Sequence, residues 1–190
     1  GVLSLPDPMR AASLVGRVLY KDPVPIWDST TGNVASFETS FTYEVMNFAH
    51  APSDGLVFFL TDPANATIPA NSREGLLGIA DAKNAFNRFV AVEFDNYANP
   101  WDPNYAHIGI RINTNSLYST KVMKWRWIYG EGFAFLKVKI IYDSPSSTLT
   151  VVTDEDGHIS TLSQILDLKW LLLMHKVVLA RGHCNDGLGS

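Results

Sequence analysis

Residues 93–107 gather side chains that could hold a divalent metal ion. Glu93 and Asp95 follow the apolar run 89–92, which reads as a strand. Residues two apart on a strand project from the same face, so both carboxylates would point in the same direction. Paired carboxylates at the end of a strand are candidates either for metal binding or for acid–base chemistry on a sugar bond.

A polar loop and a second strand-like run complete this group. Asn99 and Asp102 lie in the loop, and His107 opens the run 108–110. Carboxylates with an imidazole suit a transition ion such as Mn²⁺, whereas carboxylates with amide and carbonyl oxygens suit Ca²⁺. The loop offers enough ligands for both ions if the two ions share a carboxylate.

The same polar loop also fits an ordinary turn. Asp and Asn in turns commonly accept hydrogen bonds from the backbone a few residues on, and Pro100 also favours a turn. A single histidine at the start of a strand commonly has a structural role. The spacing alone therefore leaves a metal site and a plain turn as open alternatives.

The elements that must position these residues read as strands. Apolar and polar residues alternate over 37–45 and again over 136–142, which is typical of strands with one buried face. The continuous apolar run 56–60 fits a strand that is covered on both faces. Turns separate these runs and no alternation of strands with helices appears, so we expect an all-β antiparallel sandwich or jelly roll. The segment 162–173 instead shows apolar residues at helical spacing.

Composition limits the possible functions. The chain has 190 residues, of which 46% are hydrophobic and 18% charged, so we expect one folded domain over 1–190. A net charge of −4 offers no basic surface for nucleic acid. The longest apolar tract, 162–179, contains charged residues and is a poor membrane span. With Cys184 as the single cysteine, an intrachain disulfide cannot form. The triplet Asn65-Ala66-Thr67 is an acceptor for N-glycosylation and fits a secretory route.

Several motifs, in order and at similar spacing, resemble the legume lectins. The motifs that carry the resemblance lie at 26–37, 53–60, 75–78, 89–95, 97–110 and 142–145. The resemblance extends from about Gly1 to Lys169, and it implies a lectin domain with the family's β-sandwich. It also implies a turn near 163–168 and a strand at about 176–180, and residues 181–184 stand where the family has a strand end and a sugar-contacting loop. The opening and closing strands of the family have no counterpart, so we expect the chain to be incomplete at both ends.

The resemblance assigns the metal ligands residue by residue. It implies that the Mn²⁺ ligands are Glu93, Asp95, Asp102 and His107. It implies that the Ca²⁺ ligands are Asp95, the carbonyl group of Tyr97, Asn99 and Asp102. Both ions are therefore expected as cofactors.

The resemblance also implies a sugar site. Asp54 would accept hydrogen bonds from two sugar hydroxyls, Asn99 would donate its amide, and Gly75 would donate its backbone N–H. Tyr97 would supply an aromatic face for the apolar side of the ring. The family's cis peptide bond before the Asp would fall here between Ser53 and Asp54.

These residues imply metal-dependent, non-catalytic recognition of glycans and glycoproteins. The loop 99–102 and the stretch 26–41 look most like those of members that bind galactose or N-acetylgalactosamine, although mannose binders share the central residues. We expect a homodimer or tetramer that contacts neither nucleic acid nor the membrane interior. We expect a glycoprotein of the secretory pathway, located in the seed storage vacuole or outside the cell.

Two other functions stay open. A lectin-derived seed storage or defence protein could keep the fold without binding sugar. A jelly-roll glycoside hydrolase could use Glu93 and Asp95 as its catalytic pair, although metal ligation would remove both from that role. Three departures from the family bear on the choice: Glu74 where glycine is common, Arg111 where an acidic or amide residue is usual, and the dissimilar stretch 170–190. The exchange at Arg111 is interpreted as mild, because that residue is not a ligand.

Overall fold

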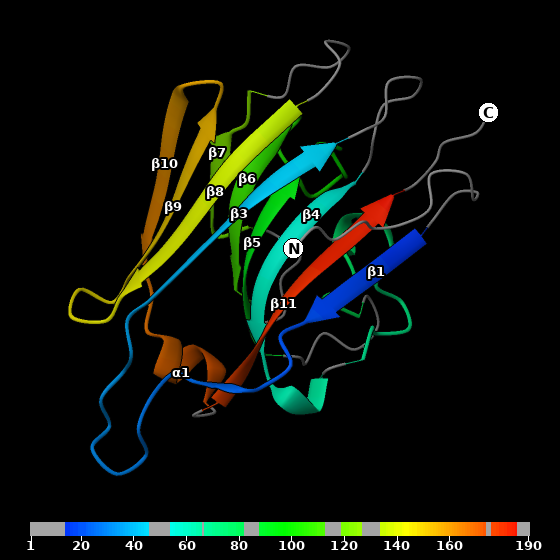
Figure 1. Cartoon of the computed structure of the whole chain (residues 1–190). Helices are drawn as coiled ribbons and strands as arrows, with labels where there is room; N and C mark the ends of the chain where they lie inside the picture. The colour runs from blue at the N-terminus through cyan, green and yellow to red at the C-terminus, as the bar shows by residue number, and fades with distance from the viewer. Residues whose placement is uncertain are drawn as a thin grey trace.

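The computed structural model is a sandwich of two antiparallel sheets, as the sequence predicts (Figure 1). It describes residues 14–45, 54–65, 67–81, 88–112, 119–126, 134–173 and 176–185. Ser53 falls outside these ranges, so the predicted cis bond before Asp54 does too. Among the described residues, no helix has both the length and the apolar character needed to cross a membrane.

The larger sheet carries the predicted site. Its strand order is β1-β11-β4-β5-β6-β7, and β2 pairs with the start of β11. The strands are β1 (Leu14–Leu19), β2 (Val24–Pro25), β4 (Gly55–Thr61), β5 (Phe89–Asp95), β6 (His107–Ile112), β7 (Lys121–Lys124) and β11 (Lys176–Asn185).

The smaller sheet covers one face of the larger one. Its order is β10-β9-β8-β3, with β3 (Phe37–Val45), β8 (Ala134–Asp143), β9 (Thr148–Glu155) and β10 (His158–Ile165). β3 and β8 follow the alternating stretches of the sequence, and residues 37 to 45 of β3 pair with residues 142 to 134 of β8. Their apolar side chains face inward because alternate residues of a strand point to opposite faces.

The main core fills the space between the two sheets. Phe58, Val92 and Ile110 from the larger sheet pack against Val138 and Ile140 from the smaller one. Aromatic rings join the layers, with the Phe41 ring 5.9 Å from the Phe94 ring. This core orients the larger sheet so that residues 93 and 95 of β5 point away from it.

A second, smaller cluster covers the opposite face of the larger sheet. Val57, Phe59 and Ala91 project outward there and are covered by Leu77 and Ile79 from the connection that follows η1 (Pro63–Asn65) and contains η2 (Glu74–Leu76). Every residue of β4 and β5 is therefore buried, which confirms the prediction that 56–60 is covered on both faces.

The segment after residue 158 differs in part from expectation. The family resemblance implies a turn near 163–168, but β10 continues to Ile165 and α1 (Leu168–Leu172) follows. The Asp167 side chain caps α1 by accepting a hydrogen bond from the backbone N–H of Trp170. The helical spacing of 162–173 holds only over α1, since residues 162–165 pair with β9 as a strand. Residues 181–184, expected at a strand end and a loop, lie within β11 and pair with both β1 and β4.

Candidate functional site

Two neighbouring strands bring the predicted metal ligands together. In the pairing of β5 with β6, Asp95 lies opposite His107 and Glu93 lies opposite Gly109. All four residues project from the face that the second apolar cluster covers, away from the main core. The pairing of the two strands thus places residues 93–95 directly beside residues 107–109.

The three side chains form a compact, buried group. One ligand atom each from Glu93, Asp95 and His107 lies within 4.8 Å of the others, and each residue is 1% exposed. His107 Nε2 lies 3.3 Å from Glu93 Oε1. Two carboxylates and an imidazole at this spacing fit the donor set of a transition ion. Asp102, the other predicted Mn²⁺ ligand, falls outside this group and is partly exposed.

Gly109 and Ser119 are parts of this group that sequence reasoning missed. A Cβ atom on residue 109 would lie 2.7 Å from Glu93 Oε1, so only glycine leaves room for that carboxylate. The Ser119 hydroxyl donates a hydrogen bond to the same oxygen. The available signal was a glycine between two isoleucines, in the strand that follows the acidic loop.

The loop after β5 contains the hydrogen bonds of a turn and also oxygen atoms that accept no hydrogen bond. The backbone N–H of Tyr97 donates to Asp95 Oδ1 at 2.8 Å, and the N–H of Asn99 donates to Asp102 Oδ2 at 3.1 Å. These are the local bonds of an ordinary turn. Asp95 Oδ2 and Asn99 Oδ1, however, are buried without a hydrogen-bond partner.

Those oxygens decide whether the residues fit a metal ion. Leaving a buried acceptor unsatisfied costs about 1–3 kcal/mol, and a bound cation would remove that cost. A carboxylate oxygen and an amide oxygen within one loop are the hard ligands that Ca²⁺ prefers. The residues therefore fit a Ca²⁺ ion in the loop and a transition ion at Glu93 and His107.

Burial and mutual repulsion perturb the acidic groups. Burial, with repulsion from Glu93, raises the pKa of Asp95 to about 8 and that of Asp102 to about 6. Burial also opposes ionisation of Glu93, but Arg111, His107 and Ser119 together hold the pKa of Glu93 below its ordinary value. Burial lowers the pKa of His107, and the nearby carboxylates, Glu93 first, outweigh that effect and raise it. If all three carboxylates were ionised, they would outnumber the two cationic groups, Arg111 and His107, that act on them.

The predicted sugar-contacting residues surround the same loop. The carbonyl of Asp54 accepts the N–H of Asn96 at 3.0 Å, which places the buried Asp54 beside the end of β5. A Cβ atom on Gly75 would lie 2.6 Å from Asn99 Cγ, so these two residues are in close contact. Tyr97 is 41% exposed and therefore offers a ring face to solvent. Four residues far apart in sequence converge at one end of β5.

The family preference for glycine at position 74 has a conformational explanation. Glu74 adopts a φ of 58°, in the left-handed region that glycine occupies without steric cost. The side chain is exposed, directly before the buried Gly75.

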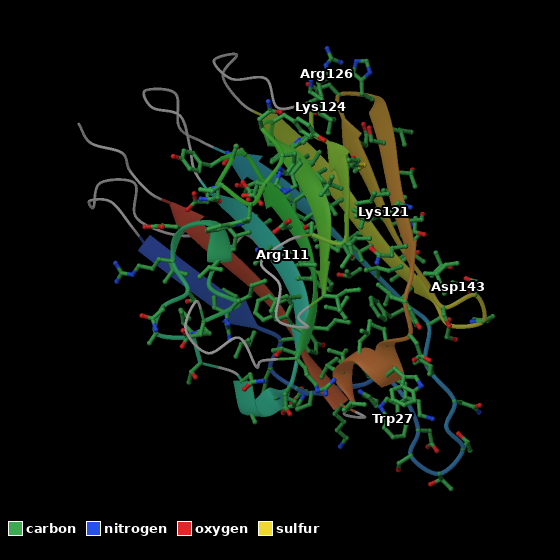
Figure 2. All side chains as sticks on the ribbon, turned by 180° about the vertical axis from the view of Figure 1, so that it is seen from behind. Trp27, Arg111, Lys121, Lys124, Arg126 and Asp143 are labelled. Atoms are coloured by element: carbon green, nitrogen blue, oxygen red, sulfur yellow. The ribbon has the colours of Figure 1, made fainter. Side chains whose placement is uncertain are left out.

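The structure gives Arg111 more contacts with the site than the sequence analysis expected when it treated the change from an acidic or amide residue as mild. The side chain is buried, and its Nη1 donates to Glu93 Oε2 at 3.0 Å and to the Gly75 carbonyl at 3.1 Å. Figure 2 shows Arg111 among the strands of the larger sheet, whereas Lys124 and Arg126 lie near the rim of the molecule. Arg111 thus touches both a predicted metal ligand and a predicted sugar-contacting residue.

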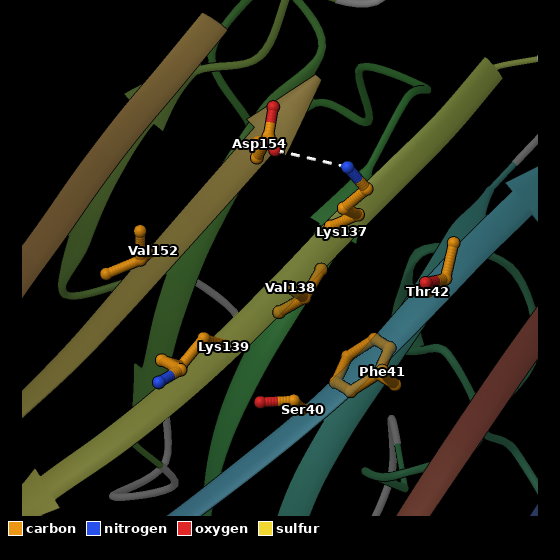
Figure 3. Close-up of a pocket in the computed structure, with 8 residues that line it drawn as sticks. All are labelled: Ser40, Phe41, Thr42, Lys137, Val138, Lys139, Val152 and Asp154. Carbon is orange, nitrogen blue, oxygen red and sulfur yellow. Dashed lines mark hydrogen bonds and ion pairs between the residues drawn. The ribbon is translucent and has the colours of Figure 1, made fainter. Parts of the chain in front are cut away.

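A pocket on the smaller sheet lies elsewhere. It runs over β3, β8 and β9 and is lined by lysines 137 and 139, Asp154 and small or apolar neighbours (Figure 3). Lys137 Nζ lies 3.4 Å from Asp154 Oδ2, with the lysine side chain 71% exposed. Exposed ion pairs of this kind contribute little to stability or recognition. The predicted glycosylation residue, Asn65, lies apart from both places, in η1, where its carbonyl accepts a hydrogen bond from Arg17 at 2.7 Å.

The chain is similar to known proteins over most of its length. A family profile described as legume lectin domain matches residues 1–179. A non-seed lectin of Pisum sativum is 51% identical over 179 residues, which cover 90% of this chain and 65% of the pea protein. The chain therefore spans less than two thirds of that relative's length.

Solved structures agree with this likeness. The Lotus tetragonolobus seed lectin superposes with a TM-score of 0.86 at 45% identity, covering 96% of this chain and 78% of that one. The winged bean acidic lectin, solved in complex with methyl-α-D-galactose, superposes with a TM-score of 0.79 at 38% identity, covering 91% and 72% of the two chains.

Proposed function

Because the chain belongs to the legume lectin family, we propose that it is a metal-dependent lectin that binds galactose or N-acetylgalactosamine without chemical change. The family consists of carbohydrate-binding proteins. The single observation that supports the metal dependence is the pair of buried oxygens, Asp95 Oδ2 and Asn99 Oδ1, that lack hydrogen-bond partners. Galactose is favoured by the winged bean relative, whose structure holds a methyl galactoside.

The proposed metal ligands follow from the donor sets. Glu93, Asp95, Asp102 and His107 would hold Mn²⁺, and Asp95, the Tyr97 carbonyl, Asn99 and Asp102 would hold Ca²⁺. When bound, the ions supply positive charge that fixes these side chains in one arrangement. Asp95 contributes to both sets, because it lies between Glu93 on β5 and the loop that begins at Asn96.

The sugar would lie over the loop at the end of β5. The Asp54 carboxylate accepts from sugar hydroxyls, and the Asn99 amide nitrogen donates to one of them while its oxygen faces the cation. The Gly75 N–H adds a donor from the neighbouring connection, and the exposed Tyr97 ring covers the apolar face of the sugar. A carboxylate bonded to two hydroxyls is a strong, oriented acceptor, so Asp54 would carry much of the binding, while the surrounding loops would discriminate among sugars.

The arrangement disfavours glycoside hydrolysis. Glu93 is held by Arg111, His107 and Ser119, and its pKa is lowered, which is unsuited to a proton donor at neutral pH. Asp95 is committed to the turn through Tyr97. Neither carboxylate is therefore positioned to act as a general acid.

Partners and location are further parts of the proposal. A single shallow site binds a monosaccharide weakly, so useful avidity with glycoproteins would come from a homodimer or tetramer. The sequon at Asn65 lies in a half-exposed turn and supports passage through the secretory pathway, with the seed vacuole or the extracellular space as destination.

The test is calorimetric titration with galactose, N-acetylgalactosamine and mannose, before and after chelation and readdition of Ca²⁺ and Mn²⁺. Binding of galactose that disappears on chelation and returns with the ions would support the proposal. A folded, metal-loaded protein that binds none of the three sugars would instead favour a storage or defence protein that retains the fold alone.

A further inference from the structure

Arg111 lies where the metal ligands and the sugar-contacting connection meet. It is on β6, opposite Ala91 of β5, and its side chain is 2% exposed. From the sequence alone, a charged residue on the outward face of a strand is expected to face solvent. Here the connection around Gly75 covers Arg111. A buried guanidinium keeps its charge, so it must be balanced by partners in the protein.

One nitrogen atom of Arg111 makes both of the contacts that matter. Nη1 lies 3.0 Å from Glu93 Oε2 and 3.1 Å from the carbonyl oxygen of Gly75. Glu93 uses its other oxygen for His107 and Ser119, so the two halves of the carboxylate serve different partners. The guanidinium therefore ties the backbone of residue 75 to a carboxylate on the adjacent strand.

A second arginine, Arg17, also contacts the connection around Gly75, but through other groups. Arg17 of β1 donates to the carbonyl oxygens of Gly78, Asn65 and Thr67, and it stacks 4.8 Å from the centre of the Phe59 ring. These contacts fix the connection without touching Glu93, Asp95 or His107. Arg17 and Arg111 thus hold the same segment, but only Arg111 links it to the metal-binding group.

From this geometry we propose that Arg111 is a positioning residue that clamps the Gly75 backbone to Glu93, so that the sugar-contacting connection keeps its place in the absence of metal ions. The value of the clamp for sugar binding rests on the proposed role of the Gly75 N–H. The clamp itself is made only by groups of this chain, the Arg111 guanidinium, the Glu93 carboxylate and the Gly75 carbonyl. It supplies a fixed positive charge to Glu93 Oε2, while His107 and Ser119 contact the other oxygen of that carboxylate.

The experiment is hydrogen–deuterium exchange of the whole chain after chelation, read from peptides over 72–78 and, for reference, over β8 and β9. The variants are Arg111→Gln, Arg111→Lys, Glu93→Gln and the double variant of Arg111→Gln with Glu93→Gln. We expect Arg111→Gln to speed exchange over 72–78 by about tenfold, because local opening of this segment would no longer have to break a charge-assisted hydrogen bond. Lys, whose ammonium can reach one partner well, should restore part of the protection.

Coupling distinguishes a clamp from general stabilisation. Glu93→Gln should loosen 72–78 about as much as Arg111→Gln, and the double variant should add little, because both changes break one bridge. Arg17→Gln is the matched control, since its effect should multiply with that of Glu93→Gln. Multiplicative effects of Arg111→Gln and Glu93→Gln, equal acceleration over β8 and β9, or unchanged exchange over 72–78 would each overturn the proposal.

Sugar titration of the same proteins separates this inference from the proposed function. A clamp that behaves as expected in a wild-type protein that binds no sugar would leave the inference standing and remove the lectin function. If the wild type binds sugar and the 72–78 segment of the Arg111→Gln variant stays protected, the lectin function would stand and the inference would be overturned.

Discussion

Each of the two sheets carries an acidic side chain next to a basic one on its outer face, but the two pairs differ in burial. On the smaller sheet, Lys137 and Asp154 lie 3.4 Å apart and are largely exposed, 71% for the lysine and 34% for the acid. On the larger sheet, Arg111 and Glu93 lie 3.0 Å apart and each is 2% exposed. The distances are similar, so burial decides which pair matters: removing water strengthens the attraction but makes an unpaired charge costly. Function is therefore expected on the buried side.

The largest expected effect comes from breaking the buried pair. Glu93→Ala leaves the Arg111 guanidinium buried without its carboxylate, which costs about 3–5 kcal/mol of unfolding free energy. Chemical denaturation of the metal-free protein measures this cost. The matched change on the smaller sheet is Lys137→Ala, which should leave the midpoint almost unmoved because water solvates Asp154 and its hydrogen bond from the Gly157 N–H remains. Equal effects of the two changes would mean that burial is not what separates the faces.

A more selective change keeps the fold and removes the charge of Asp95, one of the two carboxylates (with Asp102) that the proposed ion sets share. Asp95→Asn relieves repulsion with Glu93, so the metal-free protein should become more stable, while Ca²⁺ affinity falls by about 100-fold or more. Calorimetric Ca²⁺ titration and thermal denaturation without metal check the two halves. A variant that loses stability and keeps Ca²⁺ binding would contradict the ligand assignment.

The pH dependence should have opposite sign with and without metal. Because the folded pKa of Asp95 is raised from 3.8 to about 8, its contribution to metal-free stability is full below pH 3.8 and is lost as the pH rises toward 8. The raised pKa of His107 acts in the same direction, and the lowered pKa of Glu93 acts oppositely only when the pH falls below its ordinary 4.5.

Metal binding displaces the protons of Asp95 and Asp102, so ion affinity should rise with pH through about 6 and on toward 8. Melting temperatures measured across pH 4 to 9, with chelator and with saturating Ca²⁺ and Mn²⁺, test both trends. If the melting temperature follows the same pH dependence with chelator as with the ions, both expected trends are contradicted.

The smallest expected effect is at the left-handed position beside Gly75. Glu74→Gly relieves roughly 1–2 kcal/mol of backbone strain and costs roughly 0.5–1 kcal/mol through the freer unfolded chain, for a net gain of about 0–1.5 kcal/mol. Loss of an exposed negative charge next to the proposed sugar site should not weaken galactose binding. Thermal denaturation and titration of this variant against Glu74→Ala separate strain from charge, because alanine removes only the charge.

The sequence predicted the sandwich and the metal-binding group because both depend on local alternation. In β3 and β8 every second residue is apolar, and Glu93 and Asp95 are two apart, so side-chain direction can be read along one strand. Arg111 escaped that reasoning because its burial comes from the covering connection around Gly75, far away in sequence. The strained φ of Glu74 and the cap that starts α1 also depend on local geometry, which composition does not encode.

The place of β11 between β1 and β4 has a consequence for synthesis on the ribosome. β4, β5 and β6 follow one another and can pair early, so the metal-binding group can assemble while the chain is still emerging. β1 cannot join the sheet until β11 has been made, and β1 carries Arg17, which secures the connection around Gly75. A nascent chain would therefore bring the proposed metal ligands together first, and would fix the connection around Gly75 only after β11 is released.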